Sequence, residues 1–366
     1  MTSEPTPPAA PSSARFSDAL AVLQRGLGET YSAAVLHVRL AGEIVVEACV
    51  GSIAPDGPAI DAAAVFDLAS LTKLFTGTAL LVLNDRRALA LDDPVTSICP
   101  EFAGPDARRQ RVTIRNLLTH TSGLPAHVNF RDEVGAAAVI GRVCATPLVA
   151  APGDAVQYSD LGFMLAGDII SRVTGLPLDR AIATLVSEPL GAQDICYVPD
   201  VDARSRIVCT EDDPWRGRLL RGEVHDENCW AMGGIAGHAG LFGAAAGVAA
   251  LGELYRTHGD SANGRVISRA AAMLAVREHA ASDSERRGLA WALKADDAHS
   301  CGQRFSASSF GHTGYTGTSL WVDPSRELTV AFLTNRVHLS RNGDSILRSR
   351  GHLHDAVADG ADRARR

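Results

Sequence analysis

The sequence predicts an α/β fold of the α+β type: an antiparallel sheet of about five or more strands flanked by helices, with a mainly helical second subdomain. Strand patterns occur at both ends of the chain, over residues 30–66 and 285–336, where apolar and polar residues alternate. Over residues 91–264 the alternation is weak, and short apolar runs are broken by Pro and Gly. Strands at both ends around a helical middle are typical of one sheet that the C-terminus completes, with the helical part packed beside it.

The first elements of the chain follow from its local patterns. Residues 1–14 are rich in Pro, Ser and Ala, a composition that predicts a disordered tail. Ser17 is a good N-cap and leucines recur at helical spacing after it, so we expect a helix from this residue. In AAVLHVRLAG apolar residues alternate with polar ones up to Gly42, and EIVVEACV resumes the alternation, which predicts an antiparallel hairpin.

Strand character returns near the C-terminus. RGLAWALK, at residues 287–294, is the first such segment, and TSLWV and RELTVAFLT follow on either side of a DPSR turn. A last helix is expected over residues 343–358, and residues 359–366 are expected to form a flexible tail. Residues 15–358 would then form the globular domain, which contains no internal repeat.

Composition narrows the class of partner. The chain has 366 residues, 46% of them hydrophobic, and a formal net charge of −7. Its only basic cluster is a terminal RARR, so we expect neither nucleic-acid nor membrane binding, and a small molecule is the expected partner. The stretches VHDEN and HLHD lack the spacing of a recognised zinc site, so we expect no metal and no cofactor.

The expected compartment is the cytoplasm. The N-terminus, MTSEPTPPAAPSSARF, has no basic region followed by an apolar core, and no stretch of the chain has the length of apolar sequence that a membrane-spanning helix needs. The 7 cysteines are odd in number and scattered without paired spacing, which fits reduced thiols better than a disulfide framework.

The first candidate for chemistry is Ser70 with Lys73, in the segment FDLASLTKLF. Residues three apart in a helix share a face, so the serine hydroxyl and the lysine amine can meet. Lys73 and Lys294 are the only lysines, and a lysine amine can be tuned to act as a base where an arginine cannot. The backbone N–H of a serine that opens a helix can also stabilise an oxyanion. The spacing alone equally fits an exposed serine beside a solvated lysine.

Two further segments favour the catalytic interpretation. GDAVQYSDLGFMLAG places Tyr158 and Asp160 just before a helix, and SSFGHTGYTGTSLWVDP places His312 just before a late strand. The order Ser-x-x-Lys, Tyr-x-Asp, His-Thr-Gly resembles the serine β-lactamase and penicillin-binding protein superfamily. The resemblance is closest to the branch that contains class C β-lactamases, β-lactamase-like esterases and D-aminopeptidases, and it extends over residues 17–358.

The resemblance implies a role for each matching residue. Ser70 would be the acylated nucleophile, Lys73 its immediate partner, and Tyr158 the general acid and base that also activates the deacylating water. The backbone N–H groups of Ser70 and Tyr315 would form the oxyanion hole. The residues that would bind the substrate are Asp160, His312, Thr313, Gly314 and Tyr315.

Two positions depart from the family pattern. Asp160 stands where the family usually has Asn. It can pair with Lys73, leaving the lysine as a fixed positive charge that favours the phenolate of Tyr158, although Asp160 fits an ordinary helix N-cap as well. His312 stands where the family usually has Lys, and a neutral imidazole holds a substrate carboxylate less well. Both departures point away from efficient β-lactam hydrolysis.

The predicted function is that of a serine hydrolase that acts through a Ser70 acyl-enzyme. A small acyl ester is the expected substrate, with acyl transfer as an extension of the same chemistry. The enzymatic alternatives are a D-amino-acid peptidase or carboxypeptidase and a weak β-lactamase, which would act on an amide or a lactam. A catalytically weak binding or scaffolding protein on the same fold is the alternative of another class. Lys73 and Tyr158 are both candidates for the general base.

Overall fold

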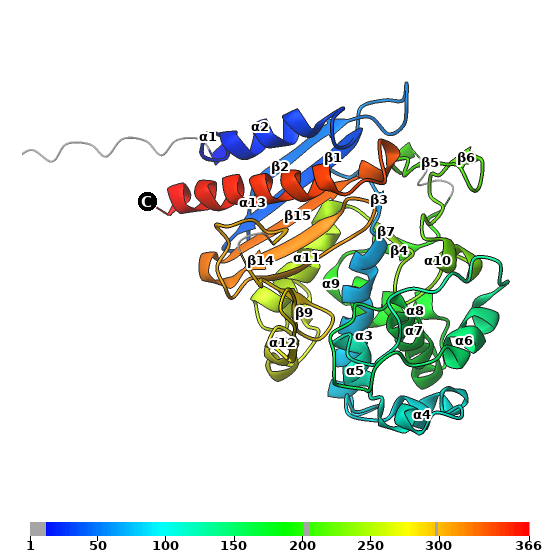
Figure 1. Cartoon of the computed structure of the whole chain (residues 1–366). Coiled ribbons are helices and arrows are strands. Elements are labelled where there is room, and N and C mark those ends of the chain that lie inside the picture. The colour runs from blue at the N-terminus through cyan, green and yellow to red at the C-terminus, as the bar shows by residue number, and fades with distance from the viewer. Residues whose placement is uncertain (1–11, 201–204, 297–298, 366) are drawn as a thin grey trace, which may run out of the picture.

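An antiparallel sheet of eight strands forms the centre of the protein (Figure 1). The structure is a computed structural model that describes residues 12–200, 205–296 and 299–365. The strands lie in the order β10-β11-β12-β13-β14-β15-β1-β2, so the N-terminal hairpin pairs with the last strand of the chain. Their bounds are β1 Ala33–Leu40, β2 Glu43–Gly51, β10 Ala280–Ala281, β11 Arg286–Arg287, β12 Ala292–Leu293, β13 Phe310–Thr313, β14 Ser319–Asp323 and β15 Leu328–Thr334.

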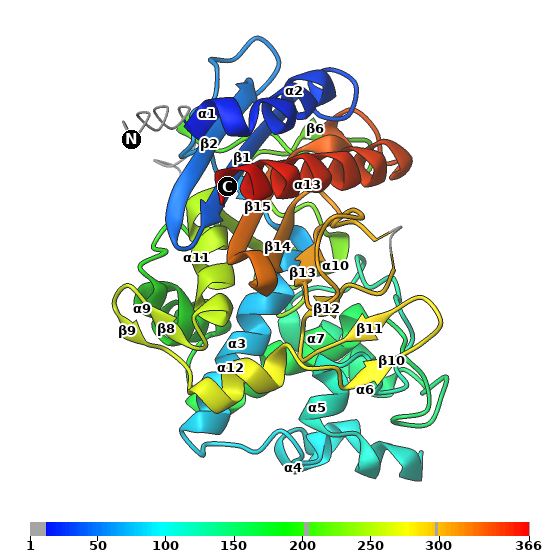
Figure 2. The same ribbon diagram turned by 90° about the vertical axis from the view of Figure 1, so that its left-hand side faces the viewer.

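Helices cover both faces of this sheet. On one face lie α2 (Ser17–Gly26) and α13 (Asp344–Ala364), which Figure 2 shows side by side across the strands. On the other face α11 (Ala245–Arg256) packs against β1, β14 and β15. Alternation along β1 therefore sends Val35 and Leu36 into two separate apolar clusters, one on each face. Helices therefore cover both faces of the central strands, and the sheet provides a rigid base for the site beside β13.

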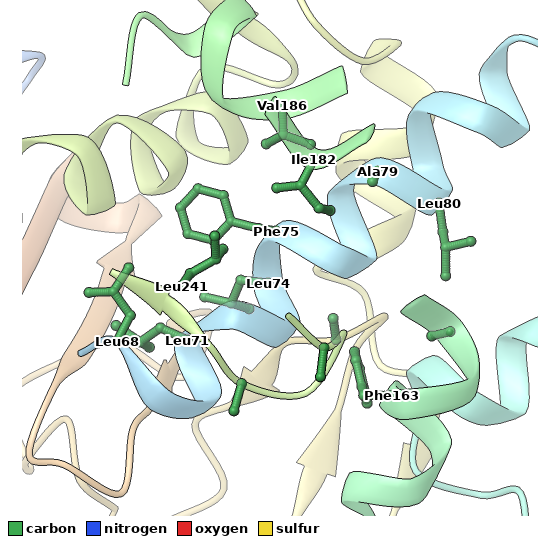
Figure 3. Close-up of a cluster of buried hydrophobic side chains, with 14 of the residues drawn as sticks. Leu68, Leu71, Leu74, Phe75, Ala79, Leu80, Phe163, Ile182, Val186 and Leu241 are labelled. Carbon is green, nitrogen blue, oxygen red and sulfur yellow. The ribbon is translucent and has the colours of Figure 1, made fainter. Parts of the chain in front are cut away.

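The helical subdomain is built around α3 (Thr72–Asp85). Nearly all of α3 is buried, as expected for a helix that is apolar on every side. Figure 3 shows Phe75 of α3 on the side of the helix where Ile182 and Val186 lie, and Leu74 lower down, near Leu241 of a neighbouring strand. The helix that begins beside Ser70 is thereby held from every direction.

Apart from α7, the remaining elements of the middle region are ten residues long or shorter. Its other helices are α4 Val95–Ile98, α5 Ile114–Leu118, α6 Ala136–Ala145, α7 Asp160–Thr174, α8 Leu178–Ile182, α9 Glu188–Leu190, α10 Glu227–Ala231 and α12 Arg269–Ala275. Its short strands are β3 Phe66–Asp67, β4 Cys196–Tyr197, β5 Asp212–Asp213, β6 Arg218–Leu219, β7 Leu241–Gly243, β8 Asp260–Ser261 and β9 Gly264–Arg265. Strands β3, β7 and β4 form a small sheet of their own, which leads directly into the site.

Some predicted boundaries were wrong. Part of the predicted tail 1–14 is helical, because α1 spans Ser12–Arg15, and residues 1–11 lie outside the described part of the chain. The predicted flexible tail 359–366 is instead helical as far as Ala364, since α13 keeps a buried face against α2. In this last part of α13 the buried residues are Gly360 and Ala361, which give no apolar period in the sequence.

The observed strands also differ from the predicted sheet segments. Of the predicted segment 30–66, only residues 33–51 belong to the large sheet, and β3 belongs to the small sheet. The predicted strand 287–294 is two short strands, because Ala290 adopts a left-handed conformation (φ 67°) that breaks the extended chain.

No single helix in the described ranges is long and apolar enough to cross a membrane. Helix α7 and the segment Leu178–Leu190 together have a suitable length and composition, but the two are bent by 81° relative to each other.

Candidate active site

Ser70 lies in a tight helical turn, Ala69–Leu71, between β3 and α3. The side chain of Asp67 fixes this turn, because it accepts hydrogen bonds from the backbone N–H of Ala69 (2.8 Å) and of His225 (2.7 Å). No hydrogen bond from the Ser70 N–H to another group of the described chain is found, as expected for the first turn of a helix. The backbone N–H of Ser70 is therefore available to a ligand.

Lys73 is completely buried and directed at Ser70. Its ammonium donates to the Ser70 Oγ (3.0 Å) and to the backbone carbonyl of His238 (3.0 Å), and it forms an ion pair with the Asp160 Oδ1 (2.8 Å). Burial lowers the pKa of Lys73, but the charges of Asp160 and Tyr158 and the hydrogen bonds with both raise it above its ordinary value overall. The ammonium is protonated and fully hydrogen-bonded, which contradicts the alternative of a solvated lysine.

Asp160 is the first residue of α7, and the pairing predicted between it and Lys73 is confirmed. The N-cap of α7 is Ser159, whose Oγ accepts from the N–H of Gly162, so the alternative role of Asp160 as the N-cap was wrong. Burial raises the pKa of Asp160, but the charge of Lys73 and the interaction with His127 hold it well below its usual range. The nearby Asp160 carboxylate raises the pKa of His127, whose Nδ1 lies 3.8 Å from the Asp160 Oδ2.

Tyr158 lies between two imidazoles and two cations. Its ring centre is 4.4 Å from that of His120 and 5.9 Å from that of His312. The Lys73 Nζ lies 4.9 Å from the ring centre, and the guanidinium carbon of Arg287 lies 5.3 Å from it. The phenol ring therefore has a cationic side chain on two of its sides.

Both imidazoles beside Tyr158 are neutral. Burial, with the charges of Arg287 and Lys73, lowers the pKa of His312 to about 3, and burial also holds the pKa of His120 well below its usual value. The Nδ1 of His312 faces the carbonyl of Thr313 at 2.8 Å, so Nδ1 carries the proton. The Nδ1 of His120 accepts from the N–H of Ser159 (3.0 Å), which orients the segment that carries Tyr158.

The segment after β13 is held against the Ser70 turn. The hydroxyl of Thr316 donates to the carbonyl of Asp67 (2.8 Å), and that of Thr318 donates to the carbonyl of Leu68 (3.0 Å). At Gly314 an added Cβ would lie 2.1 Å from the Thr318 Oγ1 and 2.7 Å from the Leu68 carbonyl oxygen, so only glycine fits there. These contacts bring Tyr315 beside Ser70. Among the described residues we find no protein acceptor for the Tyr315 N–H, so it too is available.

Ser70 borders two cavities that share Tyr158 and Tyr315 in their walls. The larger, of about 720 Å³, is lined by His312, Thr313 and Gly314 and by the side chains of three arginines. The smaller, of about 360 Å³, is lined by three acidic residues, two histidines and Arg341, among others. The arginines of the larger cavity are Arg287, Arg336 and Arg350, and the acidic residues of the smaller cavity are Asp160, Asp226 and Glu227. All the predicted site residues therefore meet around one serine.

Comparison with known proteins identifies the family. The sequence profile of the family described as Beta-lactamase matches residues 22–352. The chain belongs to the beta-lactamase family.

Known proteins that are similar to this chain carry several activities in their names. A protein of Escherichia coli (strain K12) named "Putative D-alanyl-D-alanine carboxypeptidase" is 30% identical over 303 residues, which are 75% of this chain and 69% of that protein. The solved structure titled "EstCE1, a hydrolase with promiscuous acyltransferase activity" has a TM-score of 0.74 at 22% identity, covering 95% of this chain and 99% of that one. The class C beta lactamase from Rhodobacter sphaeroides has a TM-score of 0.74 at 20% identity and coverages of 96% and 100%. The two structures show that the beta-lactamase fold extends over the whole domain.

Several residues of this site could not be predicted from the sequence. The three cavity arginines carry no motif, and in a chain with many arginines nothing distinguishes them. Arg287 opens a predicted strand, which was a possible signal for a position near the sheet edge. His238, in the glycine run GGIAGHAGLFG, contributes its carbonyl to Lys73. The run packs closely against α7, because a Cβ at Gly237 would lie 2.2 Å from the Phe163 carbonyl oxygen.

Proposed function

We propose that the protein is a serine hydrolase that acts through an acyl-enzyme at Ser70. The observation that carries this proposal is the fully buried Lys73 ammonium, 3.0 Å from the Ser70 Oγ and 2.8 Å from the Asp160 carboxylate. A lysine held in this way is a fixed positive charge beside the nucleophile, and it stabilises both an alkoxide-like serine and a phenolate.

The mechanism follows from this arrangement. The Tyr158 phenolate accepts the Ser70 hydroxyl proton while Oγ attacks the acyl carbon, and the carbonyl electron pair moves onto oxygen. The N–H groups of Ser70 and Tyr315 bind that oxyanion. Collapse of the intermediate expels the leaving group, which takes the proton from Tyr158. Water then attacks the acyl carbon of the Ser70 acyl-enzyme while Tyr158 accepts a proton from it. Collapse of this second intermediate breaks the bond to Oγ, which takes the proton back from Tyr158, and Ser70 is free again.

We propose a small acyl ester as the first substrate class. Asp160 supports it, because its carboxylate is engaged by Lys73 and cannot donate a hydrogen bond to a substrate amide oxygen as Asn does. The neutral His312 supports it as well, since an uncharged imidazole gives no attraction to a carboxylate at the position where the family usually has Lys.

A D-amino-acid carboxypeptidase is the second candidate. The guanidinium of Arg287, which also pairs with Glu285 (3.0 Å), lies in the wall of the larger cavity beside Ser70 and is a cation where His312 is neutral. A carboxylate of a peptide C-terminus suits such a group. The printed name of the Escherichia coli relative supports the same substrate class.

Labelling and turnover test this proposal. The protein is incubated with a fluorophosphonate and with a chromogenic short-chain ester, a chromogenic cephalosporin and a D-Ala-D-Ala peptide. We expect an adduct on Ser70 and ester turnover, both lost in Ser70→Ala. Ser284 also lines the larger cavity, so Ser284→Ala is the matched control that keeps both. Faster release of D-Ala than of the ester alcohol would favour the carboxypeptidase. A protein that is neither labelled nor active would be a binding protein on this fold.

A further inference from the structure

The turn that carries Tyr315 is held by a buried arginine. Arg350, on α13, is only 4% exposed, and its Nη2 donates to the backbone carbonyls of Gly314 (3.0 Å) and Thr318 (2.7 Å). No carboxylate lies within ion-pair distance of it in the described ranges, and its Nε has no hydrogen-bond partner there. Arg350 is thus a buried cation whose contacts go to the oxyanion side of the site.

The carbonyl that Arg350 binds belongs to a specific peptide group. The Gly314 C=O and the Tyr315 N–H are the two ends of one peptide unit, and the N–H end is the oxyanion donor proposed above. A charge-assisted hydrogen bond to the carbonyl draws electron density from the peptide and makes its N–H a stronger donor. The bond also fixes the peptide plane, because turning the N–H away would break the contacts of the Gly314 oxygen with Arg350 and with the N–H of Gly317 (3.1 Å).

Burying a guanidinium without a carboxylate is unfavourable. The two hydrogen bonds to backbone carbonyls compensate part of that cost. A carboxylate beside Arg350 would compensate more of it, but it would also neutralise the positive charge. An unneutralised cation behind the peptide attracts the negative charge that develops in front of it. The missing carboxylate partner is therefore useful if the N–H of Tyr315 binds an oxyanion.

We propose that Arg350 is a positioning residue for acylation, which orients and polarises the Gly314–Tyr315 peptide so that its N–H stabilises the oxyanion. This inference rests on the proposed function. As the Ser70 Oγ bonds to the acyl carbon, the carbonyl electron pair moves to oxygen beside this N–H, and it returns when the leaving group departs. Arg350 forms no bond to substrate and transfers no proton.

The test compares a neutral 4-nitrophenyl ester with its thiono analogue. Sulfur is larger than oxygen and accepts hydrogen bonds weakly, so a working oxyanion hole accelerates acylation by the oxo ester more than by the thiono ester. We expect Arg350→Met to slow acylation by the oxo ester about tenfold, less than the roughly 10²–10³-fold cost of removing an oxyanion donor. The oxo-to-thiono ratio of acylation rate constants should fall, and Arg350→Lys should be intermediate. A loss of folded protein alone lowers both rates equally and leaves this ratio unchanged.

Arg109 provides the matched control. It is 3% exposed in the helical subdomain and donates to the backbone carbonyls of Phe102, Cys144 and Thr146, so Arg109→Met removes the same kind of group far from Ser70. We expect it to lower stability and to leave the oxo-to-thiono ratio at the wild-type value. If Arg350→Met does not fold, Arg350→Lys carries the test, since it keeps a charge on a side chain one atom too short to reach the position of the Arg350 Nη2, which makes both contacts.

Each outcome is decisive. A lower ratio in the Arg350 variants and not in Arg109→Met supports the inference. A wild-type ratio in a folded Arg350 variant overturns it while the Ser70 adduct still forms, which leaves the proposed function intact. An effect confined to the KM of anionic substrates would make Arg350 a substrate contact and would also overturn it. A wild-type protein that forms no adduct overturns both proposals.

Discussion

The ion pair between Lys73 and Asp160 predicts how much stability the protein loses in Asp160→Asn. In Asp160→Asn the buried ammonium keeps its contacts with Ser70 and His238 but loses the counter-charge at 2.8 Å. Breaking a buried ion pair by removing one partner costs about 3–5 kcal/mol. The loss of unfolding free energy cannot exceed about 5 kcal/mol at pH 7, because the buried lysine can instead lose its proton. About 5 kcal/mol is the cost of neutralising a lysine of ordinary pKa at that pH. The Asn amide oxygen still accepts a hydrogen bond, so we expect a loss of about 3 kcal/mol in unfolding free energy.

The pH dependence of the unfolding free energy tests whether this loss comes from the unpaired Lys73. The pKa of Lys73 is raised in the folded state, so its contribution is present below the ordinary lysine pKa and is lost only as pH rises through the folded value. The pKa of Asp160 is lowered, so its contribution is lost only in acid. The contribution of the pair in the wild type is therefore constant from about pH 5 to 9. In Asp160→Asn burial lowers the pKa of Lys73, so stability should increase over this range by up to about 1.4 kcal/mol per pH unit.

Two measurements decide this prediction: urea unfolding at several pH values and the pH–rate profile for an activated ester. Loss of the counter-charge should let Lys73 titrate within the assay range and move the acid limb of the rate profile. A variant that matches the wild type in stability within about 0.5 kcal/mol, with the same acid limb, would refute the role of Lys73 as a fixed charge.

Two further predictions concern the segment after β13 and the buried histidines. Gly314→Ala should reduce acylation by about 10²–10³-fold in ester assays, because the new Cβ would displace the segment from the Ser70 turn. Gly141→Ala, in α6 with open space around its Cα, should change neither acylation nor fold, and equal effects of the two would contradict this account. The pKa of His312 is about 3 and that of His354 about 4, so the unfolded chain takes up more protons below pH 6.5 and urea unfolding should show stability falling in acid. His312→Gln and His354→Gln should each reduce that slope by up to about 1.4 kcal/mol per pH unit, and an unchanged slope would mean that the histidine is charged in the fold.

Much of this architecture could be predicted from the sequence because the signals are local or belong to a motif. Alternation identified β1, β2, β14 and β15, and the Ser-x-x-Lys, Tyr-x-Asp and His-Thr-Gly segments identified the residues that meet around Ser70. The last part of α13, residues 359–364, was missed because the residues that it buries are Gly360 and Ala361, which are too small to give an apolar pattern.

Long-range contacts account for what the sequence could not predict. Arg350 reaches Gly314 from a helix whose placement depends on the whole sheet, and the contact appears only when the chain is folded. The backbone carbonyl of His238 likewise reaches Lys73 through the tertiary fold, and a main-chain acceptor leaves no trace in residue type. The pairing of Lys73 with Asp160 was predictable because the motif already placed both residues at one point.

The central claim is that Ser70 is acylated during turnover. The direct test is rapid-quench intact-mass analysis of the protein with a 4-nitrophenyl ester of a bulky acid, which deacylates slowly. We predict a burst of one 4-nitrophenol per protein and a mass increase equal to the acyl group, located by peptide mapping on the segment that contains Ser70 and absent in Ser70→Ala. Turnover without an acyl adduct, or an adduct on a different residue, would contradict the account.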